Sequence, residues 1–162
     1  MGDTVLHSPA SRVGEITDEV RTLVADMYDT MDAAPGVGLA APQVGVGLRI
    51  FVYNYTDDDG EPWRGEVINP ELWIAPLEPG FPDPDEESEG CLSFPGERFP
   101  LRRSDRALLS GTDLEGAPVR IEVDGWRARI LQHEFDHLDG IIYIDRLDDS
   151  DWKTTQKIAR KR

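Results

Sequence analysis

Apolar residues recur at helical spacing in two stretches of this chain, and strand-like patterns lie between them. Between Ile16 and Met31 an apolar side chain returns every three or four positions, and Thr17 stands before the first turn as an N-cap. This pattern predicts an amphipathic helix near the N-terminus with its apolar face on the core. We expect the helix to be structural, because its residues suggest no chemistry.

The second helical stretch covers residues 125–139 and is apolar over much of its surface. Asp124 precedes it as a candidate N-cap, and Gly140 follows it as a stop signal. A helix of this kind is expected to be buried. The polar residues of a buried helix must have hydrogen-bonding, charged or metal partners, because burial of an unpaired polar group is costly.

Strands are predicted for most of the region between the two helices. Aliphatic and aromatic residues bounded by turn signals occupy the ranges 48–55, 66–74, 98–110 and 118–123. Asn69-Pro70 interrupts the second range, and the prolines and acids of 76–89 predict a solvated loop. Several strands followed by one buried helix indicate an α+β fold, in which antiparallel or mixed β-sheets pack around that central helix. We expect a single domain over residues 1–162.

Composition and charge narrow the functional classes. The 17 Lys and Arg are outnumbered by 32 Asp and Glu, and the net charge of −15 argues against a specific DNA partner. No apolar run is long enough to cross a bilayer, so no membrane role is expected. The start of the chain lacks a secretion signal, and the single cysteine, Cys91, favours a reducing compartment. We therefore expect a cytoplasmic protein.

The candidate chemistry lies on the second helix. His133 and His137 stand one turn apart on the same face. Two imidazoles at this spacing can bind one metal ion, and Glu134 beside the first can accept a proton from a metal-bound water. The alternative is a helix with two half-buried histidines and a surface glutamate.

A catalytic metal site usually has three protein ligands, and Cys91 is the best candidate for the third. Its acidic neighbours Glu87 and Glu89 disfavour a reactive thiolate, whereas a divalent cation stabilises a thiolate directly. His7 lies in an irregular stretch and is expected to be structural. The alternative for a lone cysteine is a small buried apolar residue.

The segment 36–45 contains three glycines, which indicate that its backbone closely approaches a ligand or another segment. Gln43 is the functional side chain that this segment presents. Its amide and the backbone N–H of Leu92 are candidate donors to the oxyanion that forms when water attacks a carbonyl. The residues therefore predict metal-assisted hydrolysis of an amide-like bond, and the softness of the ligands favours zinc.

Three motifs taken together resemble one family, the peptide deformylases. They are GVGLAAPQ at 36–43, EGCLS at 89–93 and QHEFDHL at 132–138, in the order in which the family has them. The likeness extends from Val5-Leu6 through the second helix. The HExxH pattern alone is shared by many metallopeptidases, whereas the three motifs together are highly specific.

The resemblance implies removal of the N-terminal formyl group from the formyl-methionine of nascent polypeptides, with release of formate. It implies Fe²⁺ as the cofactor, with Zn²⁺, Ni²⁺ or Co²⁺ able to substitute. A metal-bound water would attack the formyl carbonyl, with Glu134 as general base and then acid. The implied metal ligands are Cys91, His133 and His137, and the implied oxyanion donors are Gln43 and Leu92.

The resemblance also implies residues that contact the substrate or support the metal site. Gly38 would place its backbone near the formyl group, and Glu89 is expected to lie close to the metal and to pair with Arg103. Arg129 departs from the family, because an apolar residue facing the methionine pocket is expected there. The residues expected to line that pocket are Val37, Trp126 and Ile130.

The residues 151–162 form a short basic tail in an otherwise acidic protein. A frayed terminal helix is the ordinary interpretation. In some peptide deformylases a C-terminal helix docks on the ribosome, so this tail is a candidate for transient contact with RNA phosphates.

Two other classes of function compete with this assignment. One is a cysteine amidase that uses Cys91 with one histidine. The other is an inactive relative that only binds metal or formylated chain ends. The joint presence of Glu134, Gln43 and three candidate ligands favours the metal-dependent hydrolase over both.

Overall fold

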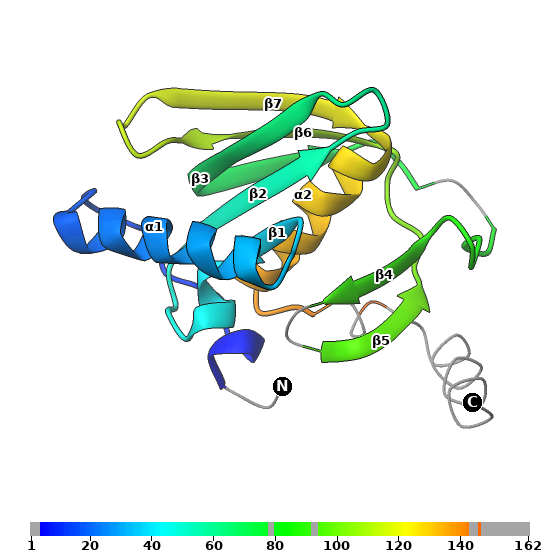
Figure 1. Cartoon of the computed structure of the whole chain (residues 1–162), viewed down its shortest axis with the longest axis horizontal. Coiled ribbons are helices and arrows are strands. Elements are labelled where there is room, and N and C mark those ends of the chain that lie inside the picture. The colour runs from blue at the N-terminus through cyan, green and yellow to red at the C-terminus, as the bar shows by residue number, and fades with distance from the viewer. Residues whose placement is uncertain (1–3, 78–79, 92–93, 143–145, 147–162) are drawn as a thin grey trace.

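The chain forms a five-stranded sheet, a two-stranded sheet and two α-helices in the part that the structure describes (Figure 1). This computed structural model describes residues 4–77, 80–91, 94–142 and 146, with the backbone alone for 94–97. The basic tail 151–162 lies outside the described residues. The elements in chain order are η1 (Thr4–His7), α1 (Asp18–Ala33), β1 (Gly38–Ala40), η2 (Ala41–Val44), β2 (Ile50–Thr56), β3 (Pro62–Ile74), β4 (Ser88–Cys91), β5 (Phe94–Pro100), β6 (Arg106–Thr112), β7 (Pro118–Asp124) and α2 (Gly125–Leu138).

The large sheet has the strand order β1-β2-β3-β6-β7, and every neighbouring pair in it is antiparallel. The small sheet consists of β4 and β5, also antiparallel. The helix α2 contacts all five strands of the large sheet, and Figure 1 shows it between that sheet and the β4–β5 pair. The predicted α+β class with antiparallel sheets is confirmed.

The side chains of β2 point alternately to the two faces of the large sheet, and they show that the two helices cover opposite faces. Ile50 and Val52 pack in the core that α1 covers, whereas Phe51 and Tyr53 pack in the core that α2 covers. Successive strand residues point to opposite faces, so a strand with four buried residues in a row must be covered on both sides. From α1 the buried side chains are Val20, Val24, Met27 and Met31, and from α2 they include Ile130, Leu131 and Leu138.

The prediction of one strand over 98–110 is wrong, because this range belongs to two strands in different sheets. Strand β5 ends at Pro100 and β6 begins at Arg106. Between them Ser104 is fixed to α2, since its backbone N–H donates to the Gln132 side chain and its carbonyl accepts from the same amide. These two buried hydrogen bonds fix the segment that connects the small sheet to the large one.

The predicted interruption at Asn69-Pro70 is present inside β3. The pairing of β3 with β6 shifts register between Ile68 and Glu71, and Asn69 adopts a φ of 53°. Proline cannot donate to a sheet ladder, so a bulge at this position is expected. No helix within the described residues is long and apolar enough to cross a membrane.

The C-terminal end of α2 is held by the N-terminal segment. The carbonyl of Leu138 accepts hydrogen bonds from the backbone N–H of Ala10 at 2.7 Å and from Arg49 Nη1 at 2.8 Å. Gly140 then turns the chain with a φ of 78°, and a Cβ at this residue would lie 2.7 Å from the backbone of Ser8. This glycine therefore serves both the left-handed turn and a close backbone approach.

We predict that Gly140→Ala destabilises the fold by about 2–5 kcal/mol, because it adds a steric clash to the cost of a left-handed alanine. The matched control is Gly116→Ala. Gly116 has a φ of 75° but no atom within 4 Å of its Cβ position. The control should lose only about 1–2 kcal/mol. Urea unfolding measures both, and equal losses would contradict the close approach to Ser8.

Candidate metal centre

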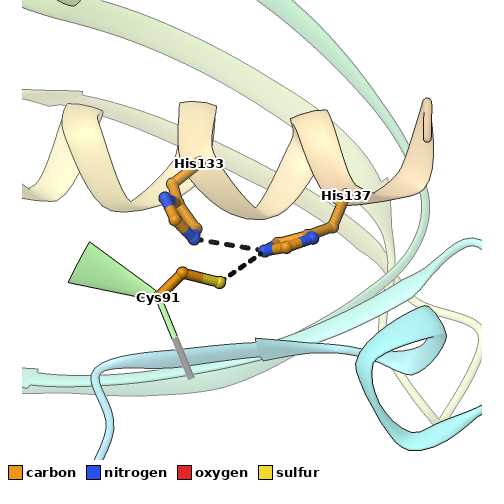
Figure 2. A group of neighbouring side chains, drawn as sticks. All are labelled: Cys91, His133 and His137. Atoms are coloured by element: carbon orange, nitrogen blue, oxygen red, sulfur yellow. Dashed lines mark hydrogen bonds between the residues drawn. The ribbon is translucent and has the colours of Figure 1, made fainter. Parts of the chain in front are cut away.

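His133 and His137 project from the same face of α2 toward β4, as Figure 2 shows. Their Nε2 atoms lie 3.2 Å apart, and the two rings meet edge to face with centroids separated by 4.9 Å. The four-residue spacing on a regular helix produces this convergence. Both side chains are buried, and that of His137 is fully so.

Cys91 enters the cluster from the end of β4 (Figure 2). The pairing with β5 shifts register between Gly90 and Cys91, and such irregularities redirect a side chain. The Sγ atom lies 3.3 Å from His137 Nε2, and the three potential ligand atoms all lie within 4.8 Å of one another. A tetrahedral cation with ordinary bond lengths would separate such atoms by roughly 3.3–3.6 Å. The donor set therefore fits one divalent ion.

The two imidazoles have different electrostatic environments. Burial, together with the nearby charge of His133, lowers the pKa of His137 to about 3, so this ring is neutral and can act as a ligand. Burial also disfavours the charged form of His133, but its contacts with Cys91 and Glu89 outweigh this effect and raise its pKa to about 10. Metal binding at His133 would therefore displace a proton.

The carboxylate of Glu89 orients the His133 ring by contacting Nδ1, the ring nitrogen that faces away from the cluster. Glu89 Oε1 lies 2.5 Å from His133 Nδ1, which directs Nε2 of the ring toward the cluster. The expected ion pair with Arg103 is present and bidentate, with distances of 2.7 and 3.0 Å. Burial alone would raise the pKa of Glu89, but Arg103 and His133 hold this pKa well below its usual range. Glu89 is thus a buried anion.

Two further buried charges complete this network, and the sequence patterns did not predict the role of either. Arg129 donates to Glu89 Oε2 at 2.8 Å, and Asp136 accepts from Arg103 at 2.6 Å and from Arg146 at 2.6 and 2.7 Å. The sequence does contain a signal for these roles: charged residues on a helix that is expected to be buried must have charged or hydrogen-bonding partners.

Glu134 is buried next to His133 and faces Gly38 of β1. A Cβ at Gly38 would lie 2.6 Å from Glu134 Oε1, so any larger residue would displace the Glu134 side chain. Within the described residues Glu134 Oε2 is buried without a hydrogen-bond partner. Burial raises the pKa of Glu134 to about 7, although a cation on the neighbouring ligands would favour its ionised form. This carboxyl group is poised to exchange a proton.

Gln43 reaches the cluster from η2. Its Nε2 donates to Cys91 Sγ at 3.5 Å, and its Oε1 accepts from the backbone N–H of Ala40 at 2.9 Å. The second contact fixes the orientation of the amide, so that its NH₂ group points to the metal cluster. Leu92, the other expected oxyanion donor, lies outside the described residues.

A cleft of about 570 Å³ opens onto the cluster. Its size is typical of a small-ligand site. All four residues expected to contact substrate are part of its lining, as is Arg129. The lining includes Val37 and Gly38 at the start of β1, Trp126, Arg129 and Ile130 on α2, and the site residues Gln43, Glu89, Cys91, His133 and Glu134.

A cysteine and two histidines that fit one cation, beside a buried glutamate at a cleft, are typical of a metal-dependent hydrolase. The family model described as polypeptide deformylase matches residues 1–153, and the chain belongs to this family. The chain is 53% identical to the peptide deformylase of Mycolicibacterium paratuberculosis over 154 residues, which cover 91% of this chain and 78% of that protein. It is 49% identical to that of Rhodococcus opacus over 165 residues, which cover 99% and 84%.

Solved structures have the same fold. The peptide deformylase from Synechococcus elongatus, solved with actinonin, matches with a TM-score of 0.79 and 38% identity over 97% of this chain and 81% of that one. The peptide deformylase from Thermus thermophilus matches with a TM-score of 0.81 and 35% identity over 99% and 90%. The chain is thus an enzyme that removes the N-terminal formyl group from nascent polypeptides in a metal-dependent reaction.

We predict that Gly38→Ala slows deformylation by roughly 100-fold while the metal content is retained, because the new methyl group displaces the Glu134 carboxylate. The control is Gly47→Ala, where the nearest atom to the added Cβ is a Val5 methyl at 3.7 Å. Formate release and metal analysis measure the two properties separately. A fully active Gly38→Ala enzyme would show that this approach does not constrain Glu134.

Proposed function

We propose that Cys91, His133 and His137 hold one divalent cation and that Glu134 transfers the proton in the deformylation reaction. The observation that carries this proposal is the convergence of three ligand atoms beside a buried carboxylate oxygen that has no partner among the described residues. The helix α2 is then the central element, since it carries all of the HExxH motif. We regard residues 1–162 as one catalytic domain, located in the cytoplasm.

The chemistry divides between the cation and the chain. When bound, a divalent cation makes a coordinated water more acidic and polarises the carbonyl to be attacked. Glu134 takes a proton from the attacking water and later delivers it to the methionine nitrogen as the bond from the formyl carbon to that nitrogen breaks. The products are formate and the protonated amine, so both hydrogens of the water end on the methionine nitrogen and its oxygen ends in formate.

Gln43 and Leu92 complete the proposed machinery as donors to the oxyanion. The Gln43 amide is supported in this role by its orientation next to Cys91. The role of the Leu92 backbone N–H rests on the motif that follows Cys91. Such a donor contributes roughly 3 kcal/mol to transition-state stabilisation in comparable enzymes.

The substrate enters the cleft with its formyl group near Gly38 and its methionine side chain against Val37, Trp126 and Ile130. We propose Fe²⁺ as the resident ion, with Zn²⁺, Ni²⁺ or Co²⁺ as substitutes. One thiolate and two imidazoles suit each of these metals, so the choice of iron rests on the family resemblance and not on the ligands.

Anaerobic purification, metal analysis and assay of formate release from formyl-Met-Ala test this proposal. We expect one metal ion per chain and an activity that chelators abolish. Glu134→Gln should keep the metal and lose roughly 100- to 10,000-fold in turnover, because the proton carrier is gone. Glu122→Gln on β7, which makes the same change of side chain away from the cluster, serves as the control.

The rival functions give other results in the same experiment. A cysteine amidase would keep its activity in the presence of chelators, and an inactive relative would release no formate even when loaded with metal. Full activity of Glu134→Gln would refute the role of this carboxyl group.

We also propose that the basic tail 151–162 makes transient contact with ribosomal RNA. The support is its positive charge in a chain of net charge −15. Deletion of the tail should weaken co-sedimentation with ribosomes at low salt and leave formate release from a short peptide unchanged. Unaltered ribosome binding would refute the contact.

A further inference from the structure

We propose that Arg129 is a positioning residue, which holds Glu89 so that the carboxylate fixes the ring of His133 and aligns β4 with α2. The inference rests on the proposed metal site and extends it to a residue where the family resemblance predicts an apolar side chain. Arg129 does not itself reach the three ligand atoms. It acts through Glu89, which it contacts directly.

The two oxygens of Glu89 are fully used by hydrogen bonds. Oε1 accepts from Arg103 Nη2 at 2.7 Å and lies 2.5 Å from His133 Nδ1. Oε2 accepts from Arg103 Nε at 3.0 Å and from Arg129 Nη1 at 2.8 Å. Each oxygen therefore has two partners, and loss of Arg129 would leave Oε2 with one. The carboxylate could then rotate about its Arg103 pair and change the direction in which it holds the His133 ring.

The spacing of the residues explains why an arginine belongs at this position. Arg129, His133 and His137 recur every four residues on α2, about 6 Å apart along one face. Glu89 and Cys91 are two residues apart on β4, about 6.6 Å along a strand, and both contact histidines of α2. Because these repeats nearly match, Glu89 lies opposite Arg129 and His133 while Cys91 lies opposite His137. The Arg129 contact is thus the first of the contacts that keep strand and helix in register.

The small sheet needs such contacts, because β4 pairs with β5 alone in the part of the chain that the structure describes. Arg129 is 6% exposed, and its Nη1 also donates to the carbonyl of Leu101 at 2.8 Å, just beyond β5. Its Nη2 lies 3.8 Å from Glu87, just before β4. One guanidinium group therefore links α2 to both strands of the small sheet, at the end where Ser88 pairs with Pro100.

The balance of buried charge supports the same role. Arg103 divides its contacts between Glu89 and Asp136, so its single positive charge serves two carboxylates. Arg129 gives Glu89 a second cation. Because a buried carboxylate is costly without compensation, this cation helps Glu89 to remain ionised and in place. Arg103 remains when Arg129 is replaced, so we expect the variant to fold.

The test compares Arg129→Met with Arg127→Met, with Co²⁺ as the probe. Arg127 lies on the same helix but pairs with Asp57 and contacts the Trp63 ring, so its replacement makes the same change in charge away from Glu89. Co²⁺ affinity is measured by competition with a chelator, and the thiolate-to-cobalt absorption band reports on ligand geometry. We expect Arg129→Met to weaken Co²⁺ binding roughly tenfold or more and to shift the band, whereas Arg127→Met changes neither.

A purely structural role would lower the Tm of metal-free and Co²⁺-loaded protein equally. A positioning role instead reduces the rise in Tm that Co²⁺ produces, and Arg129→Lys, which retains the charge, should recover part of that rise. Arg129→Gln carries the same test if Arg129→Met does not fold.

The outcomes separate the two proposals. If wild-type protein fails to bind Co²⁺, the proposed metal site falls and this inference falls with it. If the wild type binds Co²⁺ while Arg129→Met, or Arg129→Gln in its place, keeps wild-type affinity and an unshifted band, only the positioning role of Arg129 is overturned.

Discussion

Glu89 is a carboxylate that is buried and ionised where β4 meets α2, and the arrangement of the site depends on its compensation. Desolvation of a charge costs several kcal/mol unless partners replace the water. Here the partners are two guanidinium groups and one imidazole, of which Arg129 and His133 come from α2 and Arg103 comes from the segment between β5 and β6. Each contact that keeps the anion stable also fixes an element, so electrostatic compensation and the alignment of Cys91 with the histidines are achieved together.

The helix α2 combines two tasks that usually conflict. Toward the large sheet it buries Ile130, Leu131 and Leu138 in an apolar core, which anchors the helix. Toward the small sheet it buries polar groups, and nearly all of these have partners. Gln132 exchanges hydrogen bonds with the backbone of Ser104. The exceptions on this helix within the described residues are Glu134 Oε2 and His137 Nδ1. A protein group bound to the Glu134 oxygen would block the access of water to it.

Arg129 lies in the lining of the cleft, although the family resemblance predicts an apolar residue at this position. Arg129 occupies a helix position where an apolar side chain was expected, yet its charge is turned toward Glu89 and the carbonyl of Leu101. Its guanidinium carbon also lies 5.6 Å from the centre of the Trp126 ring. The arginine thereby joins the wall of the cleft without presenting an unpaired charge to it.

The sequence alone determined the local features: the two helical patterns, most strands, the interruption at Asn69-Pro70 and the family, because side-chain periodicity and motif spacing reflect the geometry of single elements. It also pointed to Cys91 as the companion of the two histidines and to Arg103 as the partner of Glu89. Only the tertiary structure decided that 98–110 divides between two sheets, since alternation is the same in either sheet. The contact of Arg129 with Glu89 and the approach of Gly38 to Glu134 likewise depend on how separate elements pack, and no local pattern encodes the distance between them.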